Sequence, residues 1–84
     1  MYDLIFDDKV IDYIEKLDMK YRKQIITKLI STKNQPYQFF KKLSYREGYK
    51  LRIGSYRAIA DIDEKKKQII IIRIGHRKNI YEKY

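Results

Sequence analysis

The sequence predicts a single small α+β domain with the order β-α-α-β-β-β, in which a helical hairpin packs on one face of a mostly antiparallel, twisted sheet. Apolar and polar side chains alternate through residues 45–61 on either side of a Gly54-Ser55 turn, which is typical of a β-hairpin. Before it, apolar residues recur at helical spacing through residues 10–30. After it, residues 68–74 contain four consecutive isoleucines, which favours a central strand covered on both faces.

The first half of the chain predicts one strand followed by two helices. Alternation in residues 2–6 indicates the strand. Asp7 or Asp8 then caps a helix, because a carboxylate accepts the free backbone N–H groups of the first turn. Asp18 ends this helix and caps a second one that runs to about Thr32. The short connection should make the two helices an antiparallel hairpin.

The second half of the chain supplies the other three strands. The second helix stops before Pro36, because proline cannot continue a helix, and residues 37–42 form a loop. The strands of the 45–61 hairpin follow, with one face towards the core and the other face open. A charged turn leads to the last strand, residues 68–74, and a polar tail begins at Gly75.

Composition indicates a small soluble protein. The 84 residues are expected to form one domain, 1–84, and the absence of cysteine excludes both a disulfide and a zinc–thiolate site. No apolar run approaches the roughly 20 residues that span a membrane. The acids near the N-terminus argue against a signal peptide. We therefore expect a cytoplasmic protein without a membrane partner.

The net charge of +9 is the strongest signal in the composition. Self-repulsion of this size weakens a compact state, so it indicates a negatively charged partner. Nucleic acid is the commonest such partner, and an acidic protein or an anionic membrane are the alternatives.

Basic side chains are predicted to gather on the open face of the sheet. By the alternation of side chains along the strands, five of them are expected to point to this open face: Lys50, Arg52, Arg57, Arg73 and Arg77. The alternative is a solvated polar face, because most exposed cations have no other role. Within the hairpin strands, however, Asp61 is the only acid of this phase, and the planar fork of arginine binds phosphate oxygens bidentately. The pattern favours a phosphate-binding surface.

Other chemistries have weaker support. His76 is the only histidine, which excludes acid–base catalysis by a histidine pair, and a single histidine is usually a surface or packing residue. Asp61 and Asp63 are interpreted as strand-end and turn residues, and the acids form no cluster suited to Mg²⁺, so no metal or cofactor is expected. Tyr81 and Tyr84 lie in the polar tail, where an exposed ring beside arginines can stack on an unpaired base.

Two stretches of the sequence resemble the RelE family of bacterial and archaeal toxins in the RelE/ParE superfamily: YKLRIGSYRAIADID and, after a short basic turn, IIRIGHRKNIY. The resemblance covers nearly the whole chain. It implies a ribosome-dependent endoribonuclease that cuts mRNA in the A site, inhibits translation, and is neutralised by a RelB-like acidic antitoxin in a heterodimer or heterotetramer. The related ParE branch shares the fold but poisons DNA gyrase and lacks the catalytic basic set. A non-catalytic nucleic-acid-binding module is the third interpretation.

The resemblance implies a catalytic set matching Lys50, Arg52, Arg57, Arg77 and Tyr81, with Tyr84 as the alternative tail tyrosine. Arg52 stands where the family often has lysine, which keeps the charge but removes a possible proton acceptor. Cations around Lys50 disfavour its charged form, which suits a general base for the 2′-OH. Arg57 is expected to stabilise the phosphorane, and Arg77 to do the same or to assist the leaving group. Tyr81 would stack on or orient a base.

Further basic residues are expected to bind RNA outside the catalytic set: Lys41, Lys42, Arg46, Arg73, His76 and Lys78. The charged turn at residues 65–67 is expected to contact ribosomal RNA phosphates as well. An acidic antitoxin segment would cross either the helical hairpin or a sheet edge, and the sequence leaves both open.

Overall fold

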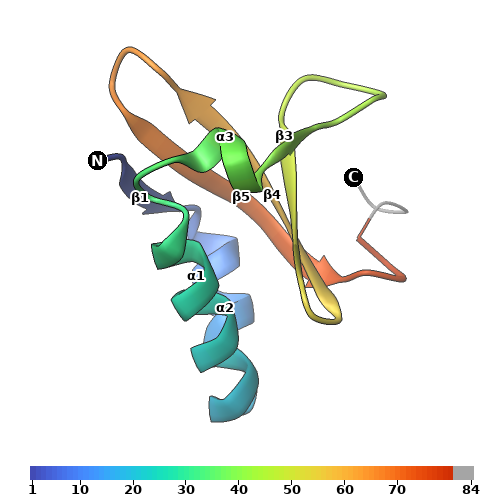
Figure 1. Ribbon diagram of the computed structural model, residues 1–84. Coiled ribbons are helices and arrows are strands. Elements are labelled where there is room, and N and C mark those ends of the chain that lie inside the picture. Colours follow the sequence, from blue (N-terminus) through green and yellow to red (C-terminus); the bar gives the residue numbers. More distant parts are fainter. Residues whose placement is uncertain (81–84) are drawn as a thin grey trace.

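The structure is a computed structural model that describes residues 1–80, and within them a five-stranded sheet lies against a pair of helices (Figure 1). The strands are β1 (Asp3–Phe6), β2 (Lys41–Lys42), β3 (Tyr49–Ile53), β4 (Tyr56–Asp63) and β5 (Gln68–His76). The helices are α1 (Asp8–Glu15), α2 (Met19–Ser31) and α3 (Pro36–Phe39). In the sheet order β1-β5-β4-β3-β2, β1 pairs with β5 in parallel and the other neighbours are antiparallel. The predicted α+β fold is confirmed.

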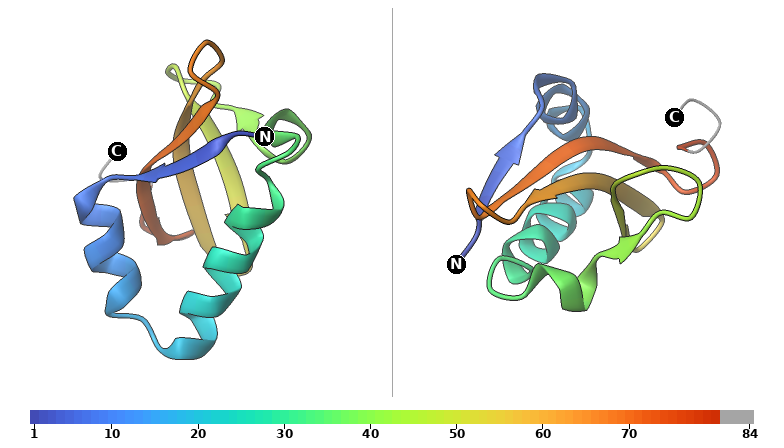
Figure 2. Two further views of the ribbon diagram at one scale, coloured as in Figure 1. Left: turned by 90° about the vertical axis from the view of Figure 1, so that its left-hand side faces the viewer. Right: turned by 90° about the horizontal axis from the view of Figure 1, so that it is seen from above.

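Both long helices follow an aspartate. Asp7 is the N-cap of α1, and its carboxylate accepts a hydrogen bond from the backbone N–H of Lys9 at 2.9 Å. Asp18 holds the same position before α2 but makes no side-chain cap bond. The two helices run antiparallel as the predicted hairpin (Figure 2). No helix within residues 1–80 is long and apolar enough to cross a membrane.

Two of the predicted element boundaries are wrong, and the predicted central strand lies next to the middle of the sheet. The predicted loop at residues 37–42 contains α3 and β2 instead. Pro36 occupies the first turn of α3, where its missing N–H costs nothing, and β2 pairs with the edge of β3. The last strand continues beyond residue 74 to His76. It is an interior strand, but β4 holds the middle position of the sheet.

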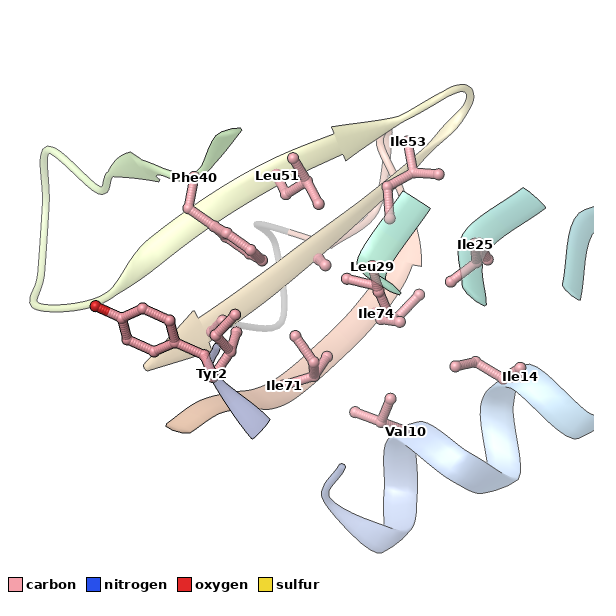
Figure 3. Close-up of a cluster of buried hydrophobic side chains, with 13 residues drawn as sticks. Tyr2, Val10, Ile14, Ile25, Leu29, Phe40, Leu51, Ile53, Ile71 and Ile74 are labelled. Atoms are coloured by element: carbon pink, nitrogen blue, oxygen red, sulfur yellow. The ribbon is translucent and has the colours of Figure 1, made fainter. Parts of the chain in front are cut away.

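The main core lies between the sheet and the two long helices (Figure 3). Ile25 and Leu29 of α2 are fully buried, and Val10 and Ile14 contribute the buried stripe of α1. The sheet supplies the opposite side of this core with Leu51, Ile53, Ala58, Ala60, Ile69, Ile71 and Ile74. The side chains of the hairpin that were predicted to face the core are therefore the ones that pack in it.

A β-bulge changes the phase of β5. Ile59 of β4 is paired with Arg73, but the next residue, Ala60, is paired with Ile71, which leaves Ile72 as the extra residue. As a result, Ile71 and Ile74 both belong to the helix-side core although they are three positions apart. The run of isoleucines thus serves both faces of the sheet.

The sheet face opposite the helices carries a second, smaller core. It consists of Leu43, Ile59 and Ile80, with Ile72 packed against it. Ile80 reaches this face because the chain turns after β5, and its backbone N–H donates to the carbonyl oxygen of His76 at 3.1 Å. The prediction that this face is open is therefore wrong where the second core covers β4 and β5.

A carboxylate in the β4–β5 turn ties three distant segments together. Glu64 accepts hydrogen bonds from the hydroxyl of Tyr2 and from that of Tyr37, each at 2.7 Å. The ammonium group of Lys67 donates to its other oxygen at 2.5 Å. The bond from Lys67, followed by those from the two tyrosines, lowers the pKa of Glu64 to about 2.

We expect Glu64→Gln to flatten the acid dependence of stability. The pKa of Glu64 is lower in the fold than its ordinary value of 4.5. The carboxylate therefore adds its full stabilisation of the folded state above about pH 4.5, and this stabilisation is lost as the pH falls towards 2. Urea midpoints measured from pH 2 to pH 7 should show a shallower acid slope for this variant. The control is Glu47→Gln in the β2–β3 loop, which should keep the parental slope; an identical slope in Glu64→Gln would contradict the prediction.

Candidate functional site

The β3–β4 hairpin holds three of the predicted site residues on one face. Leu51 and Ile53 are buried in the helix-side core, so Lys50 and Arg52 point to the opposite face. Arg52 is directly paired with Arg57 of β4. Paired residues of an antiparallel sheet have Cβ atoms about 4.5–5.5 Å apart, so two guanidinium groups start from adjacent positions. Like charges placed in this way are unfavourable without an anion between or above them.

A hollow of about 320 Å³ at the β2–β3 edge gathers these cations. Its basic lining residues are Lys28, Lys41, Lys50, Arg52 and Arg57, and none of the described residues that line it is an acid. Lys41 is brought in by β2, where it is the partner of Lys50. Lys28 reaches the hollow from α2, with its ammonium group 5.0 Å from the centre of the Phe39 ring. We call this the edge hollow.

A second hollow, of about 340 Å³, lies beside the β3–β4 turn. It is lined by Ser55, Arg57, His76, Arg77 and Lys78, again without an acid among the described residues. The backbone N–H of Arg77 donates to the carbonyl oxygen of Ser55 at 2.9 Å, which fixes the segment after β5 against the turn. We call this the turn hollow. Arg57 lines both hollows and so joins the two halves of the predicted catalytic set.

Other predicted RNA-binding residues lie elsewhere. Lys42 and Arg46 line a larger hollow, of about 910 Å³, at the opposite end of the hairpin, which they share with three acids, Glu47, Asp61 and Asp63. Arg73 lines a hollow between α1 and β5. None of these three residues lines the edge or the turn hollow, although the hollow of Arg73 shares His76 with the turn hollow. Lys65–Lys67 lie in the turn at the same distant end of the sheet.

His76 has a packing role in addition to its place in the turn hollow. Its ring packs edge-on against Tyr56, with centroids 5.8 Å apart, and Tyr56 in turn contacts Tyr21 and Tyr13. Its Nδ1 accepts from the backbone N–H of Lys78 at 3.5 Å, a long contact. Tyr81 and Tyr84, the candidate tail tyrosines, lie outside the described residues.

The two hollows together form one basic surface, and no acid among the described residues lines it. Guanidinium and ammonium groups converge there from β2, β3, β4, α2 and the segment after β5, and they match the geometry and charge of phosphate oxygens. Among residues 1–80, no three His, Cys, Asp or Glu side chains form a group that could hold a metal ion. Lys28 is the member that the sequence did not predict, because helical periodicity does not tell which sheet edge a helix borders.

Solved structures of toxin–antitoxin complexes share this fold. A chain of the RelBE2 complex from Mycobacterium tuberculosis aligns with a TM-score of 0.81 and 24% identity, over 90% of this chain and 98% of that chain. The archaeal RelE–RelB complex from Pyrococcus horikoshii OT3 gives 0.77 and 19%, over 93% and 97%. The intact E. coli RelBE complex gives 0.76 and 25%, over 90% and 96%. No curated protein sequence matches significantly.

The fold is that of a toxin of the RelE/ParE superfamily. Residues 4–81 match the family described as "ParE toxin of type II toxin-antitoxin system, parDE", and the chain therefore belongs to this family. The superfamily membership predicted from the sequence is confirmed.

Proposed function

We propose that this toxin is a metal-independent endoribonuclease that cuts mRNA on the ribosome and so inhibits translation in the cytoplasm. The observation that carries the proposal is the position of Arg57 between two basic hollows that no described acid lines, one containing Lys50 and Arg52 and the other Arg77. A phosphodiester seated at Arg57 would have cations on both sides. This is the arrangement that a cleavage with a dianionic transition state requires.

The proposed reaction uses the RNA's own 2′-OH as nucleophile. Lys50 removes its proton, and the oxygen attacks phosphorus while the bond to the 5′ oxygen breaks. Arg57 and Arg52 stabilise the charge on the phosphorane, and Arg77 assists the leaving 5′ oxygen. Tyr81 would orient the adjacent base. Because Lys50 is the one weak acid or base among these cations, much of the rate must come from alignment of the reacting oxygens, which the ribosome would supply.

The antitoxin partner follows from the same surface. The M. tuberculosis, P. horikoshii and E. coli relatives were each solved as RelB–RelE complexes. We propose that this chain likewise binds a RelB-like acidic antitoxin, in a heterodimer or heterotetramer. Negative side chains over Lys50, Arg52 and Arg57 would relieve the repulsion among them and exclude RNA.

Inhibition of DNA gyrase without nuclease activity is the second candidate function. The matching family description names ParE toxins, which favours it. The basic set Lys50, Arg57 and Arg77 favours the nuclease, because the resemblance to RelE includes these positions and the ParE branch lacks them.

Cleavage mapping with purified components separates the two functions. The toxin is incubated with mRNA in the presence and absence of ribosomes, and primer extension locates the cuts; a gyrase supercoiling assay runs in parallel. We expect codon-spaced cuts that require ribosomes, little cleavage of free mRNA, and unaffected gyrase. Intact mRNA on ribosomes together with gyrase-linked DNA breaks would overturn the nuclease proposal in favour of the second function.

A further inference from the structure

The two long helices divide the charges of the N-terminal half between them. Helix α1 contains Asp8, Asp12 and Glu15 but a single lysine. Helix α2 contains no acid at all, and its four cations are Lys20, Arg22, Lys23 and Lys28. Adjacent helices with such different charge must present different surfaces to their surroundings.

All three lysines of α2 line one hollow of about 650 Å³ between α2 and the β3–β4 turn. Lys20, Lys23 and Lys28 line it together with Arg52, and none of its described lining residues is an acid. Eight residues of helix separate the outer two lysines, a rise of about 12 Å. We call this row with Arg52 the α2 track.

The track is unfavourable for the isolated fold. Lys20 lies in the first turn of α2, where the positive end of the helix dipole disfavours a cation. Lys20 and Lys23 are three residues apart on one helix face, so they repel each other. A polyanion bound along the row would reverse both effects.

Helix α2 and the β3–β4 turn approach each other closely. Gly54 has a φ of +59°, and a Cβ atom there would lie 2.8 Å from Nε2 of Gln24. Lys28 is held over the Phe39 ring. The cations of the track therefore extend from a preformed scaffold.

The track is continuous with the proposed catalytic surface. Lys28 and Arg52 line both the track and the edge hollow, and Arg57 links the edge hollow to the turn hollow. One basic belt thus runs from Lys20 to Arg77. An RNA-bound toxin would meet phosphates along all of it.

We propose that the α2 track binds the sugar–phosphate backbone of double-stranded RNA beside the cleavage site. The proposal rests on the nuclease function, which makes RNA the polyanion. Apart from its cations, the track presents the hydrogen-bonding side chains of Gln24, Thr27 and Ser31 beside Ile53 and Gly54, and no aromatic side chain among the described residues lines it. Surfaces for single strands use aromatic rings to stack bases, whereas duplex RNA is bound through phosphates and 2′-hydroxyls by side chains of these polar kinds.

Charge reversal tests the track. The full-length variant Lys20→Glu/Lys23→Glu is compared with Lys9→Glu/Lys16→Glu, which makes the same change in net charge on α1 and at its C-cap. Glutamate near the start of α2 suits the helix dipole, so the first variant should fold. Binding to a blunt RNA duplex of about 16 base pairs, and to one of its strands alone, is measured by fluorescence anisotropy over a range of salt concentrations.

We expect the α2 variant to weaken duplex binding about tenfold or more and to reduce the salt slope by about two, with the α1 variant close to the parent. If both variants lost duplex binding equally, net charge alone would explain the binding, and the proposal for the α2 track would be overturned. Unchanged duplex binding by the α2 variant would also overturn the proposal, even if that variant no longer bound an acidic antitoxin peptide. The assay involves neither ribosome nor cleavage, so a parent that binds duplex through α2 but cuts no mRNA would refute the nuclease alone.

Discussion

Arg57→Ala is expected to lower ribosome-stimulated mRNA cleavage by at least about 100-fold, the loss typical of removing one donor to a developing oxyanion. Among the described residues, Arg57 alone lines both the edge hollow and the turn hollow. It lies directly opposite Arg52 and belongs to neither hydrophobic core of the described residues. The variant should therefore lose activity while it remains folded. Primer extension on ribosome-bound mRNA measures the first effect and circular dichroism the second.

Two further variants identify what Arg57 contributes. Arg57→Lys keeps the charge but not the planar fork, so it should recover only part of the lost rate. Arg46→Ala removes an exposed arginine at the opposite end of the hairpin, and should leave the chemical step unchanged and affect binding at most. If Arg57→Ala cleaves at the parental rate, or no more slowly than Arg46→Ala, the assignment of the site is wrong.

The sequence predicted the hairpin and its cation pair because both depend on local rules. A period of two in residues 45–61 sets which side chains share a face, and a two-residue turn sets the register. Once Leu51 and Ile53 are assigned to the core, Lys50 and Arg52 must lie on the other face, and Arg57 falls opposite Arg52. The structure agrees on each of these points.

The parts that the sequence missed depend on contacts between distant segments. Strand β5 contributes side chains to a core on each face of the sheet, and Ile72 is the extra residue of the bulge between them. A regular alternation of side chains does not predict such a bulge. Charge alone could not show that Lys42 and Arg46, predicted to bind RNA outside the catalytic set, share a hollow with Asp61 and Asp63. Lys28 was missed for the opposite reason, because its neighbours in the edge hollow come from strands far along the chain.

The site also depends on how firmly α2 is held, and Leu29→Ala tests this. Leu29 is fully buried in the helix-side core, so truncation should lower the free energy of unfolding by about 2–5 kcal/mol. A small domain has only a narrow margin of stability. The thermal midpoint should therefore fall by at least about 8 °C, as measured by calorimetry or circular dichroism.

The neighbouring residue provides a matched control. Ile30 is 55% exposed on the same helix, so Ile30→Ala removes a side chain of the same size from outside the core and should change the free energy of unfolding by no more than about 0.5 kcal/mol. Equal losses in the two variants would show that α2 does not pack through the Leu29 face. In that case Lys28 would not be held beside Arg52, and both the edge hollow and the α2 track would lose the helix that forms one of their walls.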